Sequence, residues 1–87
     1  MAPIPTILIV DDEERLCRSI EALLVREGYY TQSIHRGQDA INLIKEKSFD
    51  LVLLDLFIKD MEGYQVLDFI NRLRPEMQVI MMTGMAS

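Results

Sequence analysis

The sequence predicts an α/β fold, a doubly wound parallel sheet with helices on both faces. Residues 51–54 (LVLL) are an unbroken apolar run that ends at Asp55, and residues 7–10 (ILIV) form a second such run that also ends in acid. Apolar runs without alternation are typical of strands buried on both faces of a parallel sheet. Single helical segments separate the expected strands, and strands that alternate with single helices pair in parallel through right-handed crossovers.

The first strand, expected over residues 6–10, leads into a helix that ends near Glu27. Asp11 or Asp12 can cap this helix, because a carboxylate accepts hydrogen bonds from the free N–H groups of a first turn. Gly28 can end the helix in the left-handed conformation that glycine adopts readily. The apolar side chains whose helical spacing predicts contact with the sheet are Leu16, Ile20, Leu23 and Leu24.

The remaining elements follow the same alternation. Residues 29–34 (YYTQSI) form a more polar strand, which is typical of a sheet edge. In the sequence, helices are expected before and after the central strand at 51–55, over residues 38–47 and 64–73, and a fourth, apolar strand is expected over residues 77–82. The helical side chains predicted to face inward are Ala40, Ile41, Ile44, Val66, Leu67, Ile70 and Leu73.

Carboxylates follow two of the four expected strands, with Asp11 and Asp12 after the first and Asp55 after the third. This suggests that the two strands are neighbours and that the sheet order is 2-1-3-4, with the first helix on one face and the other two on the opposite face. Open α/β sheets bind ligands beyond the carboxyl ends of their strands. Three clustered carboxylates repel one another, and Mg²⁺, which prefers oxygen ligands, relieves that repulsion. The sequence therefore predicts a Mg²⁺ site at these acids.

Each candidate residue also has an ordinary structural interpretation. Asp11 taken alone is more often a helix cap than a metal ligand, and Asp55 taken alone could simply end a strand. His35 is expected to be a surface histidine, since no second ligand is in view, and Cys17 is expected to be a small packing residue. The functional interpretation depends on the acids acting together.

Composition excludes several classes of function. With 87 residues the chain is expected to form one small domain, residues 1–87. A formal net charge of -5 argues against direct binding of nucleic acid or of an anionic membrane surface. Cys17 is the only cysteine, so no intrachain disulfide can form, which fits a reducing cytosol. No run of about 18 apolar residues and no signal peptide is evident, so a cytoplasmic location is expected.

Four motifs in register resemble the response-regulator receiver domain of two-component signalling, a CheY-like, flavodoxin-like fold. They are ILIVDDE at residues 7–13, DLVLLDL at 50–56, MEG at 61–63 and VIMMTG at 79–84. No single motif is very specific, but together they span the chain in order and spacing. The resemblance implies a signalling phosphoacceptor rather than an enzyme, apart from self-phosphorylation from phosphodonors and self-dephosphorylation.

The resemblance also implies a role for each acid. The position of Asp55 takes a phosphoryl group from a histidine kinase or phosphotransfer protein. The position of Asp12 binds Mg²⁺ directly, that of Asp11 does so largely through water, and the backbone carbonyl of Phe57 is a further ligand. The position of Thr83 hydrogen-bonds the phosphoryl group, and a small residue such as Gly84 leaves room for it.

The sequence departs from this family in two ways. Lys59 stands where the family usually has a proline, and the family pattern continues with a helix, a strand carrying a lysine and a final helix. The expectation is therefore a truncated receiver that is either a fragment or self-associates through its uncovered fourth strand. The alternative is a non-signalling pseudo-receiver, a binding or dimerisation module. An Asp-nucleophile phosphohydrolase is a weaker option, because Phe57 rather than an acid stands two residues after Asp55.

Overall fold

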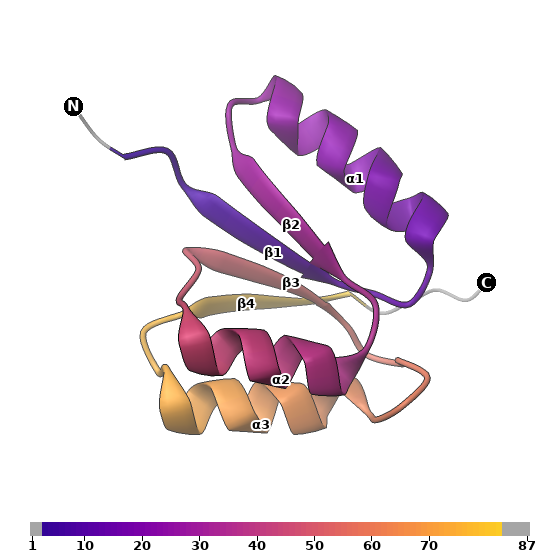
Figure 1. The fold of residues 1–87 in the computed structure, drawn as a ribbon, viewed down its shortest axis with the longest axis vertical. Helices are drawn as coiled ribbons and strands as arrows, with labels where there is room; N and C mark the ends of the chain where they lie inside the picture. The colour runs from indigo at the N-terminus through magenta and orange to yellow at the C-terminus, as the bar shows by residue number, and fades with distance from the viewer. Residues whose placement is uncertain (1–2, 83–87) are drawn as a thin grey trace.

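The protein is described by a computed structural model over residues 3–82, and it forms a parallel sheet between two helical layers (Figure 1). The elements in chain order are β1 (Thr6–Val10), α1 (Glu14–Arg26), β2 (Tyr30–Ile34), α2 (Gly37–Glu46), β3 (Leu51–Asp55), α3 (Gly63–Leu73) and β4 (Gln78–Met82). All seven were predicted from the sequence, and no end differs from its prediction by more than two residues. No described helix has the length and apolar character needed to cross a membrane.

The strand order is β2-β1-β3-β4, and all neighbouring strands are parallel, which confirms the predicted topology. In the central pair, Val10 is the register partner of Leu54. The residues that follow these two, Asp11 and Asp55, therefore leave the sheet side by side. The register alone thus explains why acids that are 44 positions apart in the sequence share one edge.

The two faces of the sheet are covered unequally. Helix α1 lies on one face, and α2 and α3 pack side by side on the other (Figure 1). Alternate residues of a strand point to opposite faces, so Leu8 and Val10 enter the core beneath α2 and α3, whereas Ile7 and Ile9 point to α1. The α2–α3 side holds the larger core. Its buried members are Leu8, Val10, Ala40, Ile44, Phe49, Val52, Leu54, Ile58, Val66, Ile70 and Met77.

The predicted inward face of α1 is partly wrong. Leu16 and Leu23 are 40% and 61% exposed, whereas Cys17 is buried and packs with Ile20 and Leu24. The expected and the observed sets of inward residues both have helical spacing. The helix is rotated relative to the prediction, so that the small Cys17 rather than Leu16 or Leu23 approaches the sheet. In α3, Val66 and Ile70 are buried as predicted, while Leu73 at the last turn is 46% exposed.

The ends of α1 confirm one prediction and correct another. Gly28 has a φ of 95°, the left-handed conformation expected just after the helix. Neither Asp11 nor Asp12 is the N-cap: that residue is Glu13, and its side chain makes no capping hydrogen bond. The Asp11 carboxylate instead accepts the backbone N–H of Glu13 at 2.8 Å, which holds the turn between β1 and α1.

Helix α2 is secured at both ends by side chains from distant segments. Arg36 precedes it without a capping hydrogen bond, and the carboxylate of Asp60 accepts the N–H groups of Gly37 and Gln38 at 2.8 and 2.9 Å. At the other end, Nε of Arg74 donates to the carbonyl of Ile44 at 2.7 Å. A negative group lies at the N-terminus and a positive group at the C-terminus, which matches the helix dipole at both ends.

The Asp60 contact predicts a pH dependence of stability. Hydrogen bonds from the N–H groups of Gln38 and Gly37 lower the pKa of Asp60. A lowered pKa contributes stability above the unfolded value of about 3.9, and this contribution is lost as the pH falls through the folded pKa. The difference in free energy of unfolding between wild type and Asp60→Ala should therefore be full at neutral pH and shrink below about pH 4. Urea unfolding at both pH values measures it, and a difference that does not change with pH would contradict the assignment.

Strand β4 forms one edge of the described sheet. Val79 and Met81 pack against the main core, while Ile80 on the other face is 54% exposed. The sequence predicts an apolar fourth strand that no later element packs against. Within residues 3–82, the edge position of β4 and the exposure of Ile80 confirm this prediction.

Candidate functional site

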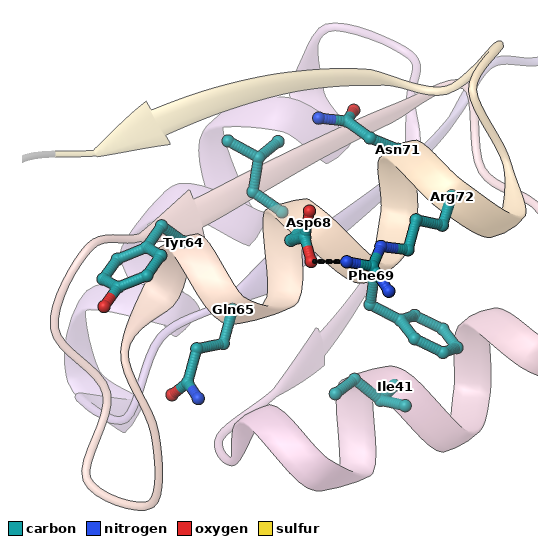
Figure 2. Close-up of a pocket in the computed structure, with 8 residues that line it drawn as sticks. Ile41, Tyr64, Gln65, Asp68, Phe69, Asn71 and Arg72 are labelled. Atoms are coloured by element: carbon teal, nitrogen blue, oxygen red, sulfur yellow. Dashed lines mark ion pairs between the residues drawn. The ribbon is translucent and has the colours of Figure 1, made fainter.

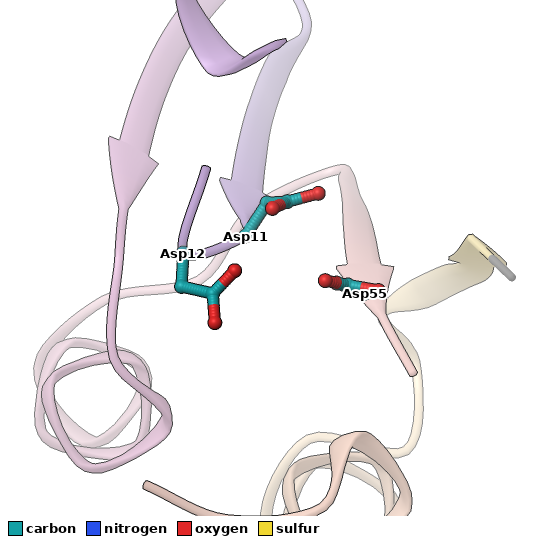
Figure 3. A group of neighbouring side chains, drawn as sticks. All are labelled: Asp11, Asp12 and Asp55. Atoms are coloured by element: carbon teal, nitrogen blue, oxygen red, sulfur yellow. The ribbon is translucent and has the colours of Figure 1, made fainter. Parts of the chain in front are cut away.

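Three carboxylates gather where β1 and β3 end. Asp11 and Asp12 follow β1, and Asp55 is the last residue of β3 (Figure 3). Each offers one oxygen atom such that the three oxygens lie within 4.8 Å of one another. The cluster predicted from the sequence is therefore present in the fold, and we refer to Asp11, Asp12 and Asp55 as the acid cluster.

Burial makes this cluster electrostatically unfavourable without a cation. Asp11 and Asp55 are buried, with 4% and 8% of their surface exposed, and Asp12 is partly buried. Desolvation, together with the charges of the neighbouring acids, raises the pKa of Asp55 above its usual value. Desolvation and the charge of Asp12 likewise raise the pKa of Asp11. Both buried carboxylates would be stabilised in their charged form by a positive ion.

Backbone N–H groups fix the orientation of the two buried carboxylates. Oδ1 of Asp11 accepts the N–H of Glu13, and Oδ1 of Asp55 accepts the N–H of Phe57 at 3.2 Å. A carboxylate has two oxygens with two lone pairs each, so each group keeps acceptor capacity for a further ligand. The partly buried Asp12 leaves the cluster accessible from solvent.

The chemistry of this donor set fits Mg²⁺. The cluster contains only carboxylate oxygens, which are hard ligands, and Mg²⁺ binds through one or two carboxylates while retaining waters or phosphate oxygens. Asp12, Asp11 and Asp55 would hold the ion. A zinc site of the usual kind would need histidine or cysteine ligands, and the acid cluster contains neither.

The loop between β3 and α3 turns sharply beside Asp55. The N–H of Gly63 donates to the carbonyl of Leu56 at 2.7 Å, and Phe57 forms an isolated antiparallel bridge with Glu62. A Cβ atom on Gly63 would collide with the carbonyl oxygen of Asp55 and would lie 2.8 Å from Cα of Leu56. Gly63 is therefore required sterically for α3 to start so close to the site.

Two of the predicted site residues, Thr83 and Gly84, lie outside the described residues. Phe57 is placed next to the acid cluster by its hydrogen bond to Asp55, and its side chain is 65% exposed. The role of its carbonyl oxygen as a metal ligand stays a prediction.

The sequence interpretation missed the contact between His35 and the site. His35 is partly buried rather than a free surface residue, and its Nδ1 lies 3.0 Å from the carbonyl oxygen of Asp11. The Cys17 thiol lies 3.5 Å from the same oxygen, and burial raises the pKa of that thiol to about 11. Cys17 is thus a buried thiol that supports the β1–α1 turn, which agrees with its predicted packing role. His35 directly follows β2, which is the neighbour of β1 in the sheet. This position in the sequence was the available signal that His35 lies near the acids after β1.

A surface groove lies elsewhere on the molecule. It has a volume of about 660 Å³ and runs along α3 and the facing side of α2, between Tyr64, Ile41 and Phe69 (Figure 2). Asp68 and Arg72 form an ion pair of 3.2 Å on its α3 wall. The groove shares no residue with the acid cluster, where the chemically reactive groups lie.

Comparison with known proteins agrees with this geometry. The transcriptional regulatory protein ZraR of Salmonella typhimurium is 38% identical over 81 residues, which cover 93% of this chain but only 18% of ZraR. A CheY-like response regulator receiver domain protein from Methanospirillum hungatei has 36% identity and a TM-score of 0.92 over 98% of this chain and 68% of that one.

A third similar protein was solved in a phosphorylated form. A response regulator protein from Burkholderia pseudomallei, whose structure contains a phosphorylated aspartic acid, a calcium ion and citrate, has 25% identity and a TM-score of 0.87. The match covers 95% of this chain and 49% of that one. The family model of the response regulator receiver domain matches residues 7–87, nearly the whole sequence. The chain therefore belongs to the response regulator receiver domain family, a family of signalling domains.

Proposed function

We propose that this chain is a phosphoacceptor that takes a phosphoryl group on Asp55 from a histidine kinase or a phosphotransfer protein. Mg²⁺ would be held by Asp11, Asp12 and Asp55 and by the backbone carbonyl of Phe57. The observation that carries the proposal is the convergence of three carboxylate oxygens within 4.8 Å, two of them from buried residues with raised pKa values. Such a group is costly to keep without a cation, so a role for the cation is its simplest explanation.

Asp55 is the best placed nucleophile of the three. It ends the central strand β3, and its Oδ1 is oriented by the N–H of Phe57, which leaves Oδ2 available for attack. Asp11 also accepts one backbone N–H, that of Glu13, but it lies in the turn after β1 rather than in a strand. A carboxylate held by a rigid strand and one backbone donor is positioned for covalent catalysis.

The proposed transfer is a displacement at the phosphorus atom of the donor. Oδ2 of Asp55 attacks the phosphorus atom of the donor, and the bond from that phosphorus to the donor's imidazole nitrogen breaks as the new O–P bond forms. The imidazole leaves with the electron pair and takes up a proton. Mg²⁺, when bound, neutralises charge on the phosphoryl oxygens. The part of this chain is to hold the carboxylates in place.

Thr83 and Gly84 have proposed roles at the rim of the same site. In the sequence they come directly after Met82, the last residue of β4, and the register partner of Met82 in β3 is Asp55. A hydroxyl at Thr83 would donate a hydrogen bond to the transferred phosphoryl group, and the small Gly84 would leave space for it.

Acetyl phosphate with Mg²⁺, followed by measurement of the intact mass, tests the proposal. Wild type should gain the mass of one phosphoryl group, and Asp55→Asn should gain none because an amide is not a competent nucleophile. Asp39→Asn, which removes an exposed carboxylate in α2, is the matched control and should be labelled like wild type. If wild type stays unlabelled and does not bind Mg²⁺, the chain is instead a binding or dimerisation module with the receiver fold.

We also propose that copies of the chain self-associate through β4. The support is the exposed Ile80 on an apolar strand at the edge of the described sheet, since unpaired edges pair readily with other strands. Sedimentation at micromolar concentration should show dimers or larger species, and Ile80→Lys should shift them toward the monomer. A wild type that sediments only as a monomer would contradict this proposal.

A further inference from the structure

One side chain joins the loop beside the acid cluster to a helix that is distant in sequence. The two carboxylate oxygens of Asp60 accept separate hydrogen bonds, Oδ1 from the N–H of Gly37 and Oδ2 from the N–H of Gln38. Asp60 therefore takes the place of the missing local cap of α2, since the preceding Arg36 provides no side-chain hydrogen bond. The contact spans 23 positions of the sequence.

A second contact reinforces the first. Gly37 has no side chain, and a Cβ atom there would collide with Cγ of Met61, which shows that Met61 lies directly against the start of α2. Met61 also packs against the main core. Asp60 and Met61 are adjacent, so a polar and an apolar contact together join the middle of the loop to the same turn of α2.

The ends of this loop meet the acid cluster. On one side the N–H of Phe57 donates to Asp55, and Phe57 is bridged to Glu62 across the loop. Between them Ile58 is buried, while Lys59 is exposed. The position of Phe57 therefore depends on how the segment that contains Asp60 is held.

We propose that Asp60 is a positioning residue that fixes the loop of residues 56–62 against α2, so that the Phe57 backbone is set for Mg²⁺ binding at the acid cluster. This inference rests on the proposed function. Without the carboxylate, the N–H groups of Gly37 and Gln38 lose their partner and the loop loses its polar anchor. The Phe57 carbonyl would then have to be ordered when the ion binds, which weakens the affinity.

Three variants separate this role from a loss of charge or of helix stability. Asp60→Ala removes both hydrogen bonds, Asp60→Asn keeps one oxygen that can accept one of the two N–H groups, and Asp39→Ala removes an exposed carboxylate from the first turn of the same helix. Calorimetric titration with Mg²⁺ should give a dissociation constant about three- to tenfold higher for Asp60→Ala, a smaller increase for Asp60→Asn, and a value within about twofold of wild type for Asp39→Ala. Equal affinities for Asp60→Ala and Asp39→Ala, or equal losses for Asp60→Ala and Asp60→Asn, would overturn the proposal.

Amide hydrogen exchange in the absence of metal provides a separate measurement. The amides of Phe57 and Gly37 should exchange about five- to tenfold faster in Asp60→Ala than in wild type, with no change in Asp39→Ala. If wild type does not bind Mg²⁺ at all, the proposed function fails, and the exchange rates still decide whether Asp60 fixes the loop. If the Phe57 amide exchanges at the same rate in Asp60→Ala as in wild type, Asp60 does not fix the loop.

Discussion

Replacing Gly63 by alanine is expected to destabilise the protein by about 3–5 kcal/mol, close to the limit for single substitutions. The added methyl group would collide with the carbonyl oxygen of Asp55 and approach Cα and the carbonyl oxygen of Leu56 at 2.8 Å. These are backbone atoms, and Asp55 and Leu56 are held by β3 and by the bond from the Leu56 N–H to Met82. Backbone atoms cannot move aside by a change of rotamer as a flexible side chain can, so the start of α3 must shift to accommodate the methyl group. Urea unfolding followed by circular dichroism measures the loss.

Gly28→Ala is the matched control, because it adds the same methyl group where space is free. No atom lies within 4 Å of a Cβ placed on Gly28, and its φ of 95° carries the only penalty. That conformation costs an alanine roughly 1–2 kcal/mol. If Gly63→Ala were no more destabilising than Gly28→Ala, the close approach of α3 to the end of β3 would be wrong.

Strand positions and sheet order could be predicted because they depend on strong local patterns. Residues 7–10 and 51–54 are apolar without interruption, and such runs suit a strand covered on both faces. The order of strands followed from chemistry at the strand ends, since acids after two strands suggested that those strands are neighbours. The observed register of Val10 with Leu54 confirms that reasoning. The acid cluster was therefore predictable once the topology was.

The contacts that the sequence did not reveal are those between distant segments. The rotation of α1 that buries Cys17 and exposes Leu23 depends on how the helix rests on the sheet, because both residues lie on plausible apolar stripes. The cap of α2 comes from Asp60 in a later loop, and no local spacing rule connects the two. The one available signal was negative: Arg36 stands where a capping residue is preferred, so a cap from elsewhere was needed.

Asp55→Asn is expected to stabilise the metal-free protein at neutral pH by about 1–2 kcal/mol, although it removes the proposed phosphoacceptor. Burial and the neighbouring acids raise the pKa of Asp55. An acid with a raised folded pKa costs stability above that pKa, and the cost disappears as the pH falls below the unfolded value. Asparagine removes one of the mutually repelling charges and keeps an oxygen that can accept the Phe57 N–H. The substitution should therefore raise the urea midpoint in the presence of a chelator.

Mg²⁺ should reverse the order of the two proteins. A ligand that binds only the folded state adds about 2.7 kcal/mol of stability at a hundredfold excess over its dissociation constant. Wild type should gain this amount, and Asp55→Asn should gain much less, because it has lost one carboxylate of the acid cluster. Asp39→Asn removes a charge outside the cluster and should respond to Mg²⁺ as wild type does. A metal-free Asp55→Asn that is no more stable than wild type would mean that the repulsion inferred from the geometry is absent. Equal gains from Mg²⁺ would instead place the ion elsewhere.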